Sequence, residues 1–224
     1  MELFVGPILK ALFLVPITLL PIINPLGAAP VFIAAVGNDR DRAKRLARQI
    51  AINSWFVLVA SMLIGTYVLA LFGISLPVVR LGGGLLLATT GWRMLHTNAD
   101  NDVQAAAAEE ASTLSHARLM QHGFFPMTFP LTTGPGAITV SIALGTQIST
   151  ANPVLYVAGA IVAAAGSLLV SIVLYFVFLN STRLLDWLGE IGTLVMMRLM
   201  AFILLCIGIQ IMWTGWAELN GMTL

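Results

Sequence analysis

The chain has 224 residues, of which 58% are hydrophobic and 9% charged, and its mean hydropathy is +0.94. A soluble domain of this length carries far more charge, so the composition predicts a protein embedded in lipid. Eleven Lys and Arg against ten Asp and Glu leave a net charge of +1, which excludes the basic surface that nucleic-acid binding requires.

Six apolar stretches are long enough to cross a bilayer, whose hydrocarbon core of about 30 Å needs about 20 helical residues. We therefore predict an all-α membrane protein with six transmembrane helices, at about residues 8–37, 49–72, 76–95, 123–148, 154–179 and 191–216. The first stretch ends in small residues, as a signal peptide does. Pro16, Pro21 and Pro25 interrupt its apolar part, however, so we expect it to remain in the mature protein.

The distribution of basic residues predicts how the chain is oriented. Residues 38–48 follow the first predicted helix and contain five Lys or Arg residues, which favours a cytoplasmic location. Six helices then place residues 96–121 and the segment around Arg183 on the same side, with both termini periplasmic. Residues 96–121 are the only long polar segment, and we interpret them as a cytoplasmic linker between two halves, residues 1–95 and 122–224.

The two halves resemble each other. A shift of 110 residues places Asn24-Pro25 of the first predicted helix on Gly134-Pro135 of the fourth, and a shift of 118 residues places Arg80 on Arg198. Because three helices are an odd number, the second half must enter the membrane from the opposite side. The sequence therefore predicts two inverted three-helix repeats, an architecture common among secondary transporters.

Helix-breaking residues cluster near the middle of the first and fourth predicted helices. Proline removes a backbone donor and glycine permits non-helical torsions, so each helix is expected to be broken into two half-helices. Non-helical backbone at membrane depth requires protein or water around it, so two matched breaks predict a cavity. The alternative is that the prolines only kink packed helices.

The starts of the half-helices would offer N–H groups and a positive dipole end to a substrate carboxylate. Asparagine and threonine side chains could cap these helices or bind a small zwitterion. The predicted substrate-binding residues are Asn24, Pro25, Gly27, Thr132, Thr133, Gly134, Pro135 and Gly136.

Other polar and small residues within the spans have simpler expected roles. Arg80 and Arg198 are each either a gate or charge partner, or a side chain that extends to the membrane interface. Asn53 and Ser54 are expected to form hydrogen bonds between helices, and glycines allow helices to pack closely. These glycines are Gly82, Gly83, Gly84, Gly91, Gly208 and Gly215.

The sequence lacks the residue patterns that several kinds of chemistry require. No Asp or Glu lies in the middle of a predicted span, so no proton-carrying carboxylate is evident, and the coupling ion, Na⁺ or H⁺, stays open. The three histidines lack metal-ligand spacing, and we predict neither a metal site nor a cofactor. No nucleophile elbow, P-loop or dinucleotide motif is present, so we do not expect an enzyme.

Three motifs are similar to those of the MarC family of bacterial inner-membrane proteins, which includes the SnatA-type neutral amino acid transporters. They are PIINPLG at residues 21–27, RLGGG at 80–84 and PLTTGPG at 130–136. The resemblance implies a six-helix plasma-membrane protein, and some members of the family move glycine or alanine using an ion gradient. It also implies that the residues of the two broken helices named above form the substrate site.

The leading hypothesis is a secondary transporter of small neutral amino acids, in which one three-helix half moves against the other. An exporter of drugs or metabolites, a passive channel and a non-transporting membrane scaffold are the alternatives. The expected partners are a small zwitterionic substrate and the lipid bilayer. The glycine-rich faces leave a homo-oligomer open, because they could serve contacts within the chain or between subunits.

Overall fold

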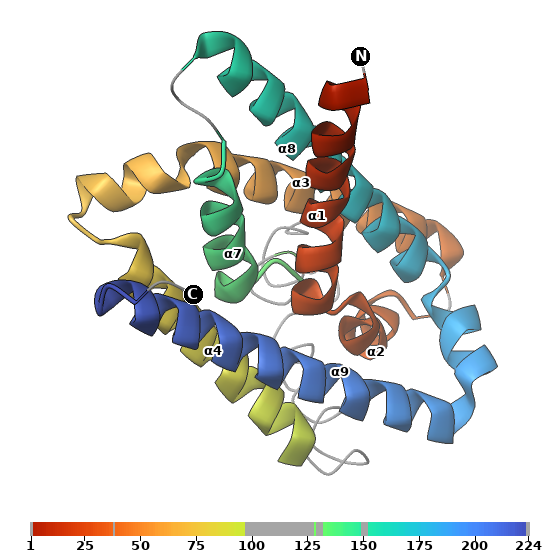
Figure 1. The fold of residues 1–224 in the computed structure, drawn as a ribbon. Coiled ribbons are helices and arrows are strands. Elements are labelled where there is room, and N and C mark those ends of the chain that lie inside the picture. The colour runs from red at the N-terminus through yellow and green to blue at the C-terminus, as the bar shows by residue number, and fades with distance from the viewer. Residues whose placement is uncertain (1, 38, 97–127, 129–131, 149–151, 223–224) are drawn as a thin grey trace.

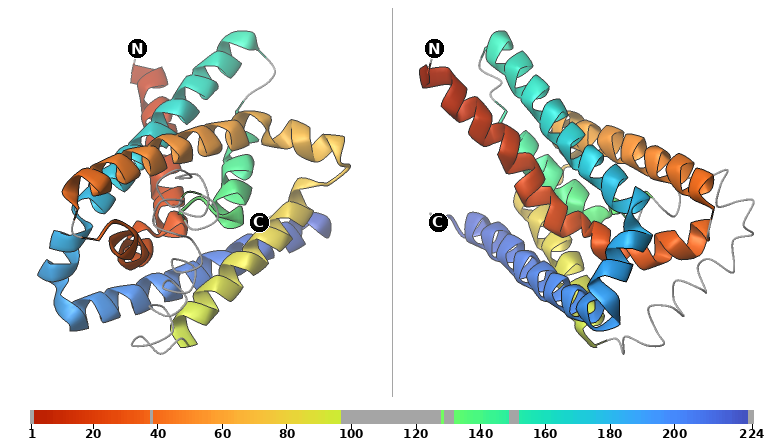
Figure 2. Two further views of the ribbon diagram at one scale, coloured as in Figure 1. Left: turned by 180° about the vertical axis from the view of Figure 1, so that it is seen from behind. Right: turned by 90° about the vertical axis from the view of Figure 1, so that its right-hand side faces the viewer.

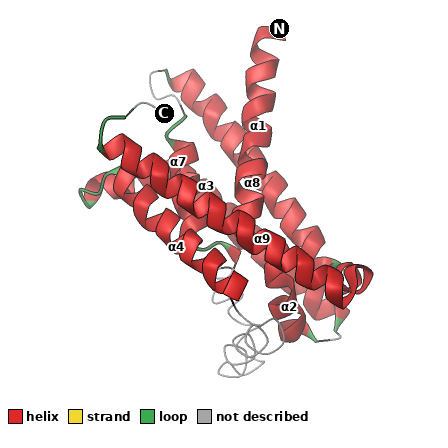
Figure 3. Cartoon of the chain, turned by 60° about the horizontal axis from the view of Figure 1, so that its bottom comes forward, coloured by secondary structure: helices red, strands yellow, loops and turns green. Residues whose placement is uncertain are grey.

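A computed structural model describes the chain except for residues 1, 38, 97–127, 129–131, 149–151 and 223–224 (Figure 1). Every regular element of the described residues is a helix (Figure 3), so the all-α prediction is confirmed. The long helices are α1 (Glu2–Ile23), α2 (Pro25–Val36), α3 (Arg40–Leu71), α4 (Leu76–His96), α7 (Pro135–Gly145), α8 (Pro153–Leu179) and α9 (Ser181–Leu219). The predicted linker, residues 96–121, lies almost wholly outside the described residues.

Helices α1 and α2 form the predicted broken span. They meet at Asn24, where the chain bends by 56°. Asn24 has φ 47° and ψ 61°, a left-handed conformation that asparagine tolerates better than most residues. Pro25 follows as the first residue of α2, a position where proline is favoured because no N–H is needed there.

Helix α3 begins earlier than predicted because Asp39 caps it. The Asp39 carboxylate accepts hydrogen bonds from the backbone N–H groups of Asp41 and Arg42, both at 3.0 Å. The bond from the Arg42 N–H is the main reason that the pKa of Asp39 lies below its usual value. With 32 residues, α3 is about 48 Å long, so its basic first turns extend beyond a hydrocarbon core of about 30 Å.

Helices α4 and α9, one from each half of the chain, pack side by side and antiparallel (Figures 1 and 2). A Cβ atom on Gly84 would lie 2.7 Å from the Gly208 carbonyl oxygen, and one on Gly91 would lie 2.7 Å from that of Ala201. A Cβ atom on Gly215 would likewise lie 2.7 Å from the Pro77 carbonyl oxygen. These glycines therefore allow the two backbones to touch, as expected.

The remaining helices pack around α3 and α8. Helix α7 contacts α1, α3 and α4, while α2 contacts α8 and α9, so both half-helices pack against helices of the other half. The buried core lies on the inward faces of these helices, and large apolar side chains such as Phe56, Tyr67 and Ile161 are exposed on the outside. An apolar exterior of this kind is suited to lipid.

Length and composition allow three of the described helices to cross a membrane: α3, α8 and the Ile191–Leu219 part of α9. The bent α1–α2 pair makes a fourth if it is counted as one span. Within α9, Gly189 has φ 65° and separates residues 181–188 from the apolar part. Helix α4 matches the predicted boundaries but is not among these spans, and the architecture of six spans in two inverted repeats remains a prediction.

Candidate functional site

The first break is held together by the side chain of Asn24. Its Oδ1 atom accepts a hydrogen bond of 3.1 Å from the Gly27 backbone N–H, while its backbone carbonyl accepts one of 3.2 Å from Ala28. Asn24 is 8% exposed, and a Cβ on Gly27 would lie 2.9 Å from the Asn24 Cγ atom. Gly27 is therefore required so that the Asn24 side chain can fold back over the helix start.

The second break precedes α7: Thr132 still lies in a helical turn, Thr133 and Gly134 leave the helical path, and Pro135 begins the new helix. The Thr133 N–H donates to the Thr128 carbonyl oxygen at 2.7 Å, which forms a wide turn. Gly134 is extended, with φ −78° and ψ 178°. The predicted split of the first span is thus confirmed at Pro25. In the fourth predicted span α7 begins at Pro135 as expected, while most of the residues before the break lie outside the described part of the chain.

Hydrogen bonds to α3 anchor this second break. The Thr133 hydroxyl donates to the Ser54 hydroxyl at 2.9 Å, and both residues are fully buried. The Asn53 Nδ2 atom donates to the Thr128 hydroxyl at 3.4 Å. Asn53 and Ser54 therefore form the expected bonds between helices, and they fix the threonine-rich turn beside α7.

The two helix starts differ in the donors that they offer. In α2 the Asn24 side chain accepts a hydrogen bond from the Gly27 N–H. In α7 no side chain of the described residues caps the helix start. The Gly136 and Ala137 N–H groups belong to the first turn of α7, in which backbone donors have no partner within the helix. Anion binding at the two breaks stays a prediction, and the uncapped donors make α7 the better candidate.

Gly136 has a packing role that the sequence did not reveal. A Cβ atom at this position would lie less than 3 Å from several side-chain atoms of Leu87 on α4. The absence of a side chain lets α4 cover the start of α7. Replacing Gly136 by a large residue would therefore disturb packing as well as any ligand.

A cavity of about 430 Å³ lies between α1, α7, α4 and α9. Its lining includes Ile22, two residues before Asn24, and Thr139, one helical turn after Pro135, but none of the eight predicted substrate-binding residues. The cavity thus reaches the neighbourhood of both breaks. Its polar lining consists of Thr18, Arg80, Thr139, Gln147, Gln210 and Thr214.

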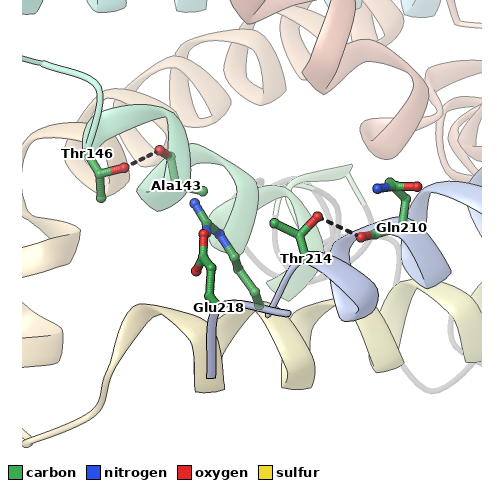
Figure 4. A network of polar contacts seen from close by, with 6 residues as sticks. Ala143, Thr146, Gln210, Thr214 and Glu218 are labelled. Carbon is green, nitrogen blue, oxygen red and sulfur yellow. Dashed lines mark hydrogen bonds and ion pairs between the residues drawn. The ribbon is translucent and has the colours of Figure 1, made fainter. Parts of the chain in front are cut away.

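Sequence reasoning did not select most of these polar residues. Thr139 is held by a hydrogen bond of 2.9 Å from its hydroxyl to the Pro135 carbonyl oxygen, and Thr214 bonds in the same way to Gln210 (Figure 4). In the sequence, the only sign of such a cavity residue is that a threonine or glutamine occurs within an apolar span. Such a residue often bonds its own helix, so the signal does not indicate which residues share a cavity.

Arg80 lines the cavity and forms an ion pair with Glu218, which lies near Ala143 and Thr146 at the end of α7 (Figure 4). The side chain of Arg80 is 16% exposed and that of Glu218 is 39% exposed. The pair joins α4 to the end of α9, so Arg80 is a charge partner of the protein's own carboxylate. Arg198, its counterpart in the predicted repeat, is partly exposed on α9 and does not line this cavity.

The described residues contain no group of three or more His, Cys, Asp or Glu side chains that could hold a metal ion. The polar groups near the breaks are hydroxyls, amides and backbone N–H and C=O groups. This chemistry suits a small molecule that carries both a carboxylate and an ammonium group.

Comparisons with known proteins agree over almost the whole chain. A family model described as "MarC family integral membrane protein" matches residues 9–220. The inner membrane protein MarC of Escherichia coli O1:K1 is 30% identical over 218 residues, and that of Citrobacter koseri is 29% identical over 217. Each alignment covers 94% of this chain and 96% of the relative. No solved structure matches.

Proposed function

Because the chain belongs to the MarC family of integral membrane proteins, we propose that it is a secondary transporter of small neutral amino acids, of the glycine and alanine class. The observation that carries this proposal is the pair of half-helices that begin at Pro25 and Pro135, with one cavity extending from the neighbourhood of both. Broken helices beside a cavity are how many transporters bind a substrate away from water.

In this proposal the uncapped start of α7 binds the substrate carboxylate through the Gly136 and Ala137 N–H groups. The hydroxyls of Thr132 and Thr133, Gly134 and the Asn24 amide surround the substrate. Pro25 and Pro135 set the helix starts, and Gly27 makes room for Asn24. Carbonyl oxygens exposed by the two breaks would bind the ammonium group and the coupling ion, Na⁺ or H⁺.

We place the protein in a bacterial inner membrane with six spans, in two inverted repeats with periplasmic termini. The basic start of α3 would then be cytoplasmic. The contacts of α2 with α8 and α9, and of α7 with α3 and α4, support the inverted repeat. Under this orientation the cavity and the Arg80–Glu218 ion pair lie toward the periplasm.

The packing of α4 against α9 favours a different moving unit from the one that the repeat suggested. These helices belong to different halves, yet their backbones touch through Gly84, Gly91 and Gly208. We infer that they move together against α1, α3, α7 and α8, with the cavity between the two groups. The Arg80–Glu218 pair joins α4 to α9 and thus stabilises the α4–α9 group at its periplasmic end.

Uptake into proteoliposomes tests the transport activity. Labelled glycine and alanine would be supplied to purified protein under an imposed proton gradient, a sodium gradient or neither. We expect one gradient to drive accumulation. The absence of flux under every gradient would contradict the proposal and favour a scaffold, whereas flux that never exceeds equilibrium would favour a channel. Efflux of larger metabolites or drugs alone would favour an exporter.

Two matched substitutions test the site. Thr133→Val removes the hydroxyl of a residue in the second break, and Ser54→Ala removes the partner of that hydroxyl while leaving Thr133 intact. We expect Thr133→Val to raise the KM for glycine by about tenfold, the size of one lost hydrogen bond to a charged group. Equal KM values in the two variants would mean that Thr133 serves packing alone.

A further inference from the structure

A second cavity, of about 630 Å³, lies between α3 and α8, away from the two breaks. It forms a groove whose lining combines cations, aromatic rings and aliphatic side chains. Lys44, Arg48, Trp55 and Phe56 come from α3, while Ser171 and Tyr175 come from α8. None of these residues belongs to the transport site proposed above.

The groove is built on a firm contact between the two helices. The Trp55 indole N–H donates to the Ala164 carbonyl oxygen at 3.0 Å, which ties α3 to α8. The Phe56 ring packs edge-on against Trp55, with ring centroids 4.8 Å apart. Phe56 and Phe176 are 60% and 56% exposed, so the wall is apolar and open to the surroundings of the protein.

Within the described part of the chain, no carboxylate neutralises the charged end of the groove. Lys44 and Arg48 lie one helical turn apart on α3, and both are exposed. No carboxylate of the described residues is within ion-pair distance of either, whereas neighbouring Arg42 pairs with Asp39 at 2.9 Å. Two adjacent cations above an apolar wall are complementary to a ligand with an anionic head and an apolar tail.

Ser171 adds a polar group within the apolar part. This residue lines the groove and is 4% exposed, and its hydroxyl has no hydrogen-bond partner among the described residues. A buried hydroxyl without a partner costs free energy, so a ligand that supplies an acceptor is favoured at this point.

We propose that the α3–α8 groove is a binding site for an anionic phospholipid of the cytoplasmic leaflet. The phosphate lies against Lys44 and Arg48, and an acyl chain follows the aromatic wall. An ester carbonyl oxygen of the lipid accepts a hydrogen bond from the Ser171 hydroxyl. The basic turns of α3 extend beyond the hydrocarbon core and therefore stand at headgroup level. The site is independent of the transported substrate.

Native mass spectrometry of the full chain in detergent tests this site. The protein would be titrated with phosphatidylglycerol and with phosphatidylcholine of the same acyl chains. The variant Lys44→Gln/Arg48→Gln removes both cations, and Arg40→Gln/Arg45→Gln removes the same charge from the same helix end without touching the groove. All four side chains are exposed, so both variants should fold.

We expect the first variant to lose about thirty-fold in affinity for phosphatidylglycerol, about fivefold for each basic residue, and the second to change little. Ser171→Ala should weaken the binding of both lipids. Unchanged phosphatidylglycerol binding in the first variant, or an equal loss in the two variants, would overturn the proposal. The proposal would also be overturned if the native protein formed a lipid-free dimer and the first variant were a monomer, because the groove would then bind a second copy of the chain.

Discussion

Single residues decide the local shape of both breaks. Asn24 combines two functions, since its backbone adopts a left-handed conformation and its side chain caps α2. Gly134, at the matching position, is extended and caps nothing. The sequence predicted both breaks because proline and glycine act on the backbone next to them. It did not predict that only one helix start would be capped.

Substitutions at Asn24 separate these two functions. Asn24→Gly keeps the left-handed conformation and loses the cap, which costs a few tenths of a kcal/mol. Asn24→Ala loses the same cap and, unlike glycine, keeps a Cβ in the left-handed region without the amide that lets asparagine tolerate it, which adds about 1–2 kcal/mol relative to the glycine variant. Thermal unfolding in detergent should therefore rank the native protein first, Asn24→Gly second and Asn24→Ala last. Equal stability of the two variants would mean that the bend relaxes when the amide is lost.

Two buried serines should respond in opposite directions to the same change. Ser141 is fully buried in α7, and its hydroxyl has no partner among the described residues. The Ser54 hydroxyl, by contrast, accepts a hydrogen bond from the Thr133 hydroxyl. We expect Ser141→Ala to stabilise the protein by about 1 kcal/mol and Ser54→Ala to destabilise it by about 1 kcal/mol, as measured by reversible chemical unfolding. Destabilisation by Ser141→Ala would show that a bound water or ligand satisfies its hydroxyl.

At the scale of the elements, glycine determines which helices can touch. Most of the glycines predicted to allow close packing do so, because a Cβ at Gly83, Gly84, Gly91, Gly208 or Gly215 would meet a neighbouring helix. Gly82 is the exception, since nothing lies within 4 Å of its Cβ position. The sequence indicated that these faces pack but not which face meets which.

The contrast between Gly208 and Gly82 provides a matched test of the α4–α9 contact. A Cβ on Gly208 would lie less than 3 Å from backbone atoms of Ala88 and from the Gly84 carbonyl oxygen, so the helices must separate. We expect Gly208→Ala to destabilise the protein by about 1–3 kcal/mol. Gly82→Ala should be neutral or stabilising by up to about 1 kcal/mol because alanine favours the helix. Similar unfolding midpoints for the two variants would contradict this packing.

At the scale of the whole molecule, the cavity and the ion pair join the two halves of the chain. Arg80 and Glu218 are far apart in sequence, and Arg80 meets the end of α9 because α4 and α9 run antiparallel. The cavity combines Thr18 from α1 and Thr139 from α7 with residues of α4 and α9. If the basic start of α3 is cytoplasmic, this cavity opens to the periplasm.

Thiol labelling of spheroplasts checks that orientation. Cys206, which is exposed, would first be replaced by serine. In that background, Thr214→Cys should react with a membrane-impermeant maleimide added outside, and saturating glycine should slow the reaction. Lys44→Cys should react only after the membrane is permeabilised. The opposite pattern would invert the orientation, and labelling that glycine leaves unchanged would separate the cavity from the substrate path.

The sequence by itself determined the membrane environment, the helix positions and the two breaks. These properties depend on hydropathy and on backbone effects of Pro25, Gly134 and Pro135, which act over a few neighbouring residues. Only the tertiary structure decided that α4 pairs with α9, that Glu218 neutralises Arg80, and that Thr18 and Thr139 share a cavity. The reason is physical: apolar helix faces are nearly interchangeable in composition, so the choice of partner depends on side-chain shapes that meet across long sequence separations.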